Sequence, residues 1–545
     1  KNLSGEVWFN ELRLSEINNK GGWAAVANLD ANFADFANVS FSGRISTDGF
    51  GSVDKSPNER SNENYSQYSV VTNINAGQLL PENWGLQIPV SYTYTEEITK
   101  PKYDSYYNDI ELDDILDITN NRDSIMNQST MLSNSKSFSV LGLSKRKTNQ
   151  KKSRIYDLEN LNLSYSYSEN NFQDFEMEYS DRKMVMANAQ YSYNFESLNI
   201  FPFESFFKNK DSKYLKWLKE FNFNPLPNSL IFSGNFNRTL YKQKFREINY
   251  SGIISNSQIP IPEFTQAKFM FDWLMSISHN VSRSLVINYN ASNSNLVPSF
   301  SKEMDINERN RMELFDNFFN VGQSNFFNQN LTANYNIPIS YFPFLDFIDA
   351  NYSYSGNFNW QRGSDILNNV IDEFGNKLGR VNTIQNSNNQ SVNLSLNFEK
   401  LYRSLKLDNK KLVSNILTSI KRVRSTYSEN SGKVLPGYLP SIGFLGTLKP
   451  SVGFVFGDQK DIRYEIAKNG WLTSFSNFNQ QYQKIYNSKF DITAEIQLLN
   501  NLRIDINANR NYSNNLSENF SIIDNQYNPI NTNYYGNFSI SSNML

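Results

Sequence analysis

Between Ile348 and Trp360 the sequence reads IDANYSYSGNFNW, and every second residue belongs to one of two chemically different sets. The first set is apolar and aromatic, and it consists of Ile348, Ala350, Tyr352, Tyr354, Gly356, Phe358 and Trp360. The second set contains only Asp, Asn and Ser. Successive side chains of a β-strand point to opposite faces, so this period of two predicts a strand that separates an apolar medium from a polar one. The same alternation recurs along most of the chain.

Composition favours a chain built from such strands. Of the 545 residues only 39% are hydrophobic, yet 14% are aromatic, with 41 Phe and 31 Tyr. A disordered chain of this polarity would contain few aromatic residues, and a large soluble core would need more aliphatic ones. No stretch approaches the roughly 18 to 20 consecutive apolar residues of a membrane-spanning helix. We therefore predict an all-β protein, a very large transmembrane antiparallel β-barrel with long loops and a few short helices.

Charge and motif content argue against several other functions. Lys and Arg number 52 against 54 Asp and Glu, so no basic excess predicts a nucleic-acid partner. Cysteine is absent, and the single histidine, His279, has no second histidine for a metal site. The glycines between Gly443 and Gly457 lack the Gly-Lys-Ser/Thr of a phosphate-binding loop. The sequence thus predicts no enzyme, no cofactor and no metal.

The strand pattern also predicts which side chains meet lipid and which meet water. On the apolar face we expect Tyr352, Tyr354, Phe358, Trp360, Ile492 and Ile504 to contact lipid. The hairpin predicted over Phe490–Ala508 places charged residues on its other face, and because an unpaired buried charge is costly, that face must be wet. We therefore expect Asp491, Glu495, Arg503 and Asp505 to face an aqueous lumen.

Three segments interrupt the alternation. Residues 96–158 are expected to form a loop or small insert, residues 205–221 a short helical element, and residues 401–426 an amphipathic helix with an apolar stripe. Residues 1–545 as a whole are predicted to be a single transmembrane β-barrel region of roughly sixteen to eighteen strands.

Several short motifs are more specific than the alternation. Near the start stand GEVWFNELRL from Gly5, GGWAA from Gly21 and LPENWG from Leu80, and later LPGYLP from Leu435, FVFG from Phe454 and GWL from Gly470. In that order they closely resemble the SprA/Sov family, the outer-membrane translocons of the type IX secretion system of Bacteroidetes. The positions that carry this resemblance are Trp8, Asn10, Glu11, Leu12, Arg13, Gly22, Trp23, Leu435, Pro436, Gly437 and Trp471.

The resemblance implies a C-terminal-half portion of a longer protein, integral to the Gram-negative outer membrane and contributing about half the strands of one very large barrel. It also implies a pore for folded, secreted cargo proteins, a PorV-type shuttle barrel and a periplasmic plug protein as partners, and outer-membrane lipid around the wall. An outer-membrane porin or nutrient receptor would share the alternation and stays an alternative. A soluble adhesin or β-solenoid stays a third, although no fixed repeat period supports it.

Overall fold

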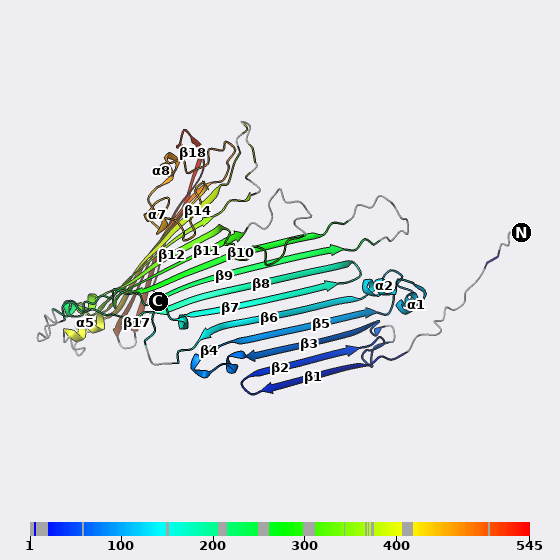
Figure 1. Cartoon of the computed structure of the whole chain (residues 1–545). Helices are drawn as coiled ribbons and strands as arrows, with labels where there is room; N and C mark the ends of the chain where they lie inside the picture. The colour runs from blue at the N-terminus through cyan, green and yellow to red at the C-terminus, as the bar shows by residue number, and fades with distance from the viewer. Residues whose placement is uncertain are drawn as a thin grey trace. The chain divides into compact units, whose positions relative to one another are not determined.

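The computed structural model describes residues 5–6, 20–56, 59–148, 152–204, 215–248, 261–297, 311–342, 344–365, 368, 370–371, 375, 377–405, 418–499 and 502–544. Eighteen strands form an antiparallel sheet, and the described helices are short (Figure 1). The all-β fold class predicted from the alternation is therefore confirmed. Among the described residues, no helix has the length and apolar character needed to cross a membrane.

Contacts divide the chain into two compact units. The first comprises residues 1–189, 236–269 and 298–320, and the second comprises residues 190–235, 270–297 and 321–545. Three strands carry residues of both units, and they are β8 (Met177–Asn194), β9 (Ser229–Phe245) and β10 (Phe264–Asn280).

The first unit contains strands that follow one another in chain order. They are β1 (Ala24–Phe33), β2 (Ala37–Ser46), β3 (Glu63–Asn75), the two-residue β4 (Leu86–Gln87), β5 (Pro89–Pro101), β6 (Met131–Lys145) and β7 (Leu161–Gln173). Figure 1 shows them side by side, and each pairs antiparallel with its neighbour, except that β3 pairs with β5 and β4 with β6.

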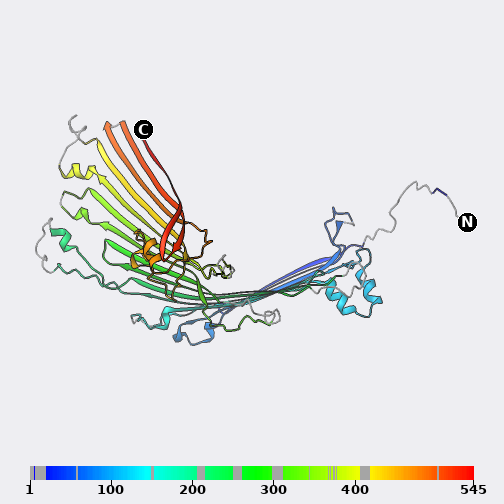
Figure 2. The same cartoon turned by 90° about the horizontal axis from the view of Figure 1, so that it is seen from above.

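The second unit contains longer strands. They are β11 (Leu285–Val297), β12 (Gln323–Ile337), β13 (Ile348–Gln361), β14 (Asn382–Asn397), β15 (Ile420–Tyr438), β16 (Tyr482–Leu499), β17 (Leu502–Ile523) and β18 (Gln526–Met544). Each pairs antiparallel with the next along the chain, from green to red in Figure 2. The hairpin predicted over Phe490–Ala508 is present, with Ile492 opposite Ala508 and Ile496 opposite Ile504.

Among the described residues, the helices lie in the connections between strands. The α-helices are α1 (Leu112–Ile118), α2 (Arg122–Ser129), α3 (Lys216–Lys219), α5 (Phe398–Ser404), α7 (Val452–Val455) and α8 (Arg463–Lys468). The 3-10 turns are η2 (Ala76–Leu79), η3 (Glu82–Trp84), η4 (Leu158–Asn160) and η7 (Ile339–Tyr341).

The predicted insert over 96–158 is only partly a connection. It contains α1 and α2, but residues 96–101 belong to β5 and Met131–Lys145 is the full strand β6, so the prediction of a loop or small insert is wrong there. The strand is hard to recognise because Asn134 and Lys136 occur where the alternation requires apolar residues. Neighbouring strands satisfy both, because Asn134 donates to the Tyr94 hydroxyl at 2.9 Å and Lys136 pairs with Glu169 at 2.9 Å.

The two predicted helices also differ from the structure. Within 205–221 the described part contains α3, and residues 205–214 lie outside the described residues. Within 401–426, α5 ends at Ser404, residues 406–417 lie outside the described residues, and β15 begins at Ile420. The amphipathic helix is therefore wrong from Ile420 onward, because Val423 pairs with Leu396 on one side and Ala494 on the other. Pairing on both edges overrides the local helical period.

Candidate functional site

One face of strands β12–β17 is apolar over half of its length. Directly opposite residues of an antiparallel pair share a face, and the register places Tyr352 opposite both Tyr335 and Val392. Val392 in turn lies opposite Tyr427, which lies opposite Phe490. A row dominated by aromatic residues thus crosses five strands of what we call the aromatic face.

From this row to the Ile348 end of β13, the aromatic face is almost free of polar side chains. The residues of this apolar band are Tyr335, Ile337, Ile348, Ala350, Tyr352, Val392, Leu394, Leu396, Val423, Tyr427, Phe490, Ile492, Ala494, Ile496, Ile504, Ile506 and Ala508, interrupted by Ser425 and bordered on β17 by Arg510, which lies opposite Phe490. Ile492 and Ile504 are half-exposed. Of the side chains predicted to face lipid, Tyr352, Ile492 and Ile504 lie in this band, and their contact with lipid stays a prediction.

The other end of the aromatic face is covered by protein. Residues 439–481, which we call the covering segment, connect β15 to β16 and pack over it. Phe358 and Trp360 are 0% and 2% exposed, and Phe358 meets the ring of Phe454 edge to face at 6.1 Å. The prediction that Phe358 and Trp360 contact lipid is therefore wrong. A neighbouring connection of the same chain occupies the place that the alternation assigned to hydrocarbon.

Polar side chains of the sheet hold the main chain of the covering segment. Gln329 donates to the Val455 carbonyl oxygen at 2.9 Å, Asn386 to that of Phe454 at 3.1 Å and Asn388 to that of Gly457 at 2.9 Å. Tyr354, one of the residues predicted to contact lipid, also binds the covering segment, because its hydroxyl donates to the Phe456 carbonyl oxygen at 2.5 Å. Buried carbonyl groups need such donors. These contacts explain amide side chains on an otherwise apolar face.

A glycine allows the covering segment to lie this close to the sheet. Gly457 has a φ of +97°, a conformation that L side chains rarely adopt. A Cβ atom there would lie 2.8 Å from the Tyr354 hydroxyl and 2.9 Å from the Cα of Gly356. Both the backbone conformation and the close approach therefore require glycine.

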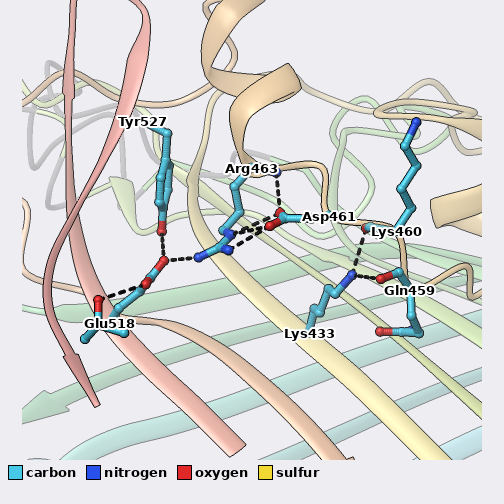
Figure 3. Close-up of polar contacts among 8 residues, drawn as sticks. Lys433, Gln459, Lys460, Asp461, Arg463, Glu518 and Tyr527 are labelled. Atoms are coloured by element: carbon cyan, nitrogen blue, oxygen red, sulfur yellow. Dashed lines mark hydrogen bonds and ion pairs between the residues drawn. The ribbon is translucent and has the colours of Figure 1, made fainter. Parts of the chain in front are cut away.

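Charged residues fix the second half of the covering segment (Figure 3). The Arg463 guanidinium pairs with the buried Glu518 of β17 and donates to Asp461 at 2.7 Å. The Tyr527 hydroxyl donates to Glu518 at 2.7 Å. On the other side of the cluster, Lys433 Nζ donates to the carbonyl oxygens of Gln459 and Lys460. The charges are thus paired or hydrogen-bonded, as burial requires.

The charged cluster lowers the pKa of the Asp461 carboxyl group. Burial opposes ionisation of Asp461, but hydrogen bonds from Arg463 and its positive charge outweigh burial and lower the pKa of the Asp461 carboxyl below its usual value. Asp461 therefore stays ionised and paired with Arg463 at acidity that protonates an ordinary carboxyl group.

The opposite face of the same strands is polar, and its amide side chains bind one another across strands. On this polar face Asn330 donates to Asn357 at 2.6 Å and Asn351 to Asn336 at 2.6 Å. Hydroxyl groups join in the same way, because the hydroxyls of Ser353 and Ser391 are 2.7 Å apart. Each such bond satisfies a donor and an acceptor without any partner from outside the wall.

The charged residues predicted to face the lumen lie together on the polar face of β16 and β17. Glu495 is opposite Asp505, and Arg503 reaches both, with distances of 3.5 Å to Glu495 and 3.1 Å to Asp505. Asp491 pairs with Lys489 at 3.0 Å. These side chains are partly exposed, which agrees with a wet surface, and their position in a lumen stays a prediction.

Two motif groups that are far apart in the sequence meet at the base of the covering segment. Leu435 is 1% exposed, and Pro436 and Gly437 follow it to the end of β15. The Thr473 N–H donates to the Gly437 carbonyl oxygen at 2.9 Å, and the Leu439 N–H donates to that of Trp471 at 2.9 Å. These motif residues therefore close the two ends of the covering segment against each other.

The motif residues near the start of the chain are only partly visible. Trp8, Asn10, Glu11, Leu12 and Arg13 lie outside the described residues. In the first unit, a Cβ at Gly22 would lie 2.3 Å from the Asp48 carbonyl oxygen, and the Trp23 N–H donates to the Thr47 hydroxyl at 3.0 Å. Gly22 and Trp23 thus lead into β1 beside the turn that follows β2.

Sequence reasoning missed the anchors of the covering segment. Gln329, Asn386, Asn388 and Lys433 all occur at positions where the alternation of their strands expects apolar residues. That break in the pattern was a usable signal, because an amide or ammonium group on an apolar face needs a polar partner. The sequence does not say which segment supplies the partner.

Fold and site together define an all-β protein with a two-faced antiparallel wall. A family model described as a motility-related or secretion protein, SprA_N, matches residues 1–116. This match confirms the resemblance to the SprA/Sov family that the motifs predicted. No curated protein matches the chain significantly. The siderophore receptor PirA from Pseudomonas aeruginosa is 6% identical over 96% of this chain and 78% of the receptor, with a TM-score of 0.28, too low to support an argument.

Proposed function

We propose that this chain forms part of the wall of a protein-conducting channel in the Gram-negative outer membrane, the translocon of the type IX secretion system. The observation that carries the proposal is the division of β12–β17 into an apolar band and a polar face. Strands with this division suit a barrel wall between hydrocarbon and water. The match to a motility and secretion family supports a role in secretion.

The proposed mechanism needs no chemical step. Backbone hydrogen bonds are satisfied between strands, so a closed wall can surround a wide aqueous lumen within lipid without a packed core. On the polar face the amide pairs Asn330–Asn357 and Asn351–Asn336 use their hydrogen-bonding groups on each other. In the same way, Arg503 pairs with the carboxylates of Glu495 and Asp505, so these charges have partners within the wall. Such a surface is hydrated but weakly adhesive, as passage of folded cargo requires.

The proposed partners follow from the family resemblance. They are secreted cargo proteins in the lumen, a PorV-type shuttle barrel, a periplasmic plug protein that closes the idle channel, and outer-membrane lipid around the wall. The polar face supplies the surface for cargo, and the apolar band supplies the surface for lipid.

Cysteine labelling tests the orientation of the wall. The 545 residues contain no cysteine, so single cysteines placed at Asp491, Glu495 and Asp505 are unique within them. In open channels in intact cells we expect a membrane-impermeant thiol reagent to label all three, and Ile492→Cys to resist labelling. Equal labelling at Asp491 and Ile492 would overturn the two-faced wall.

Deletion separates a translocon from a porin or nutrient receptor. We expect a strain that lacks the protein to retain its cargo inside the cell while the outer membrane stays intact and small nutrients enter normally. Normal secretion combined with a loss of nutrient uptake would instead favour the porin or receptor.

A further inference from the structure

The covering segment lies on the same face of the wall as the apolar band. Trp360, which it buries, belongs to the same face of β13 as Tyr352, and Leu435 belongs to the same face of β15 as Tyr427. If the apolar band meets lipid, as the proposed function requires, residues 439–481 lie on the outside of the wall. The segment is then neither a plug nor a gate within the lumen.

The first part of the covering segment lies directly against the sheet, where the Phe444 ring stacks on that of Phe271 at 6.1 Å. The indole N–H of Trp273 donates to the Phe444 carbonyl oxygen at 3.0 Å, and a Cβ at Gly446 would lie 2.5 Å from the ring of Phe327. The backbone is therefore already seated on the sheet at Phe444 and Gly446. In the same stretch, Leu445 between these two residues is 67% exposed, and Leu448 and Val452 further on are 62% and 56% exposed.

These three exposed side chains belong to one short stretch of the chain that carries little charge, and we call them the apolar knuckle. Between Pro440 and Gly457 the only charged residue is Lys449. Its ammonium group lies 5.1 Å from the centre of the Trp471 ring. A lysine beside a tryptophan is typical of a membrane interface, where the aromatic ring stays at headgroup level and the amine reaches water.

We propose that the apolar knuckle, Leu445, Leu448 and Val452, inserts into the outer-membrane lipid at the edge of the bilayer next to the apolar band. The occupant is acyl chain, because the knuckle carries no charge and lies on the lipid side of the wall. Lys449 and Trp471 mark the headgroup level. The knuckle thereby fixes how deeply this part of the wall sits in the membrane. This inference rests on the proposed function.

Depth measurement by spin labelling tests the inference. Single cysteines at Leu445, Leu448 and Val452 are spin-labelled in the purified full-length protein reconstituted in lipid nanodiscs, and collisions with oxygen and with a water-soluble nickel chelate are compared. Ile492→Cys reports the apolar band, and Asp491→Cys reports the polar face. Asn469→Cys is the matched control, because Asn469 is an exposed polar residue of the same segment.

We expect the three knuckle labels and Ile492→Cys to collide mainly with oxygen, and Asn469→Cys and Asp491→Cys mainly with the chelate. If Ile492→Cys reports lipid but the knuckle labels report water, the inference is wrong and the proposed function stands. Knuckle labels shielded from both reagents would mean that a protein covers them, which also overturns contact with lipid. If Ile492→Cys itself reports water, the membrane wall fails, and the inference fails with it.

Discussion

The indole N–H of Trp360 donates a 3.1 Å hydrogen bond to the carbonyl oxygen of Pro440, eighty residues further along the chain. Trp360 ends the apolar list of β13, and Pro440 stands near the start of the covering segment. The contact turns a side chain that the alternation assigns to lipid into a buried anchor for a connection.

Truncation of this anchor should loosen the covering segment. We expect Trp360→Ala to destabilise the protein by about 3 to 5 kcal/mol, because it removes a fully buried ring as well as the hydrogen bond. Urea unfolding in detergent measures the stability, and limited proteolysis within 439–481 reports local loosening. Tyr352→Ala removes an aromatic side chain outside the covered region and should leave the segment resistant to protease. Equal proteolysis of both variants would contradict the anchoring role.

The ion pair between Arg463 and Glu518 should be costly to break from one side only. Arg463 is 13% exposed and Glu518 3%, so Arg463→Gln leaves the buried Glu518 carboxylate without a charged partner, at a cost of about 3 to 5 kcal/mol. Glu518→Gln should cost less, because Arg463 keeps its ion pair with Asp461 at 2.7 Å. The double variant should lose less than the sum of the two. The unfolding midpoints of the original protein, the two single variants and the double variant together give a double-mutant cycle. The exposed pair of Arg503 and Glu495 is the control, and Arg503→Gln should cost no more than about 1 kcal/mol. Additive losses at Arg463 and Glu518 would refute the coupling.

Acid should release the second half of the covering segment. Because the folded pKa of Asp461 is lowered, its pairing with Arg463 contributes fully above the unfolded carboxyl pKa of about 3.9. The contribution is lost as the pH falls through the lower folded value. Hydrogen exchange of residues 461–470 at decreasing pH measures the release. Asp461→Asn should exchange faster at neutral pH and vary less with pH. An unchanged pH profile in that variant would assign the acid response to another group.

Gly457→Ala should disturb the covering segment far more than Gly470→Ala. Both glycines have positive φ, +97° at Gly457 and +68° at Gly470, so both substitutions strain the backbone. Only at Gly457 would the new Cβ meet the sheet, since the nearest atom at Gly470 is 3.9 Å away. Protease resistance of 439–481 compares the two variants. Equal protease resistance of the two variants would mean that the close approach of Gly457 to the sheet does not matter for the covering segment.

Arg238 should hold a second connection, in the first unit. Its guanidinium is buried and donates to the carbonyl oxygens of Asp316 at 2.5 Å and Phe318 at 2.9 Å, among four such bonds. Arg238→Met should speed hydrogen exchange of residues 312–320 markedly. Arg238→Lys should do so less, because its ammonium group replaces only some of these donors. The exposed Arg44 is the control, and Arg44→Met should change nothing in that segment.

The sequence by itself determined the strands and their two faces. The period of two in Ile348–Trp360 and in Phe490–Ala508 follows from local geometry, because each side chain of a strand points away from its neighbours whatever the rest of the chain does. The motif residues likewise predicted the resemblance to the SprA/Sov family, which the family model matches over residues 1–116. Asp491, Glu495, Arg503 and Asp505 were grouped on one face by the same local rule. In the structure Arg503 pairs with Glu495 and Asp505, and Asp491 pairs with Lys489.

Only the tertiary structure decided what covers each part of a face. Phe358 and Trp360 look the same in sequence as Tyr352, yet they are buried because a connection about eighty residues further on folds back over them. Pairing with strands on both sides makes the residues from Ile420 onward a strand in spite of their helical period. In β6, a neighbouring strand supplies the hydrogen-bond partner of the polar residue Asn134. A local pattern states that a side chain is apolar. Whether lipid or protein covers that side chain depends on segments that are distant in the chain. No local period predicts where those segments lie.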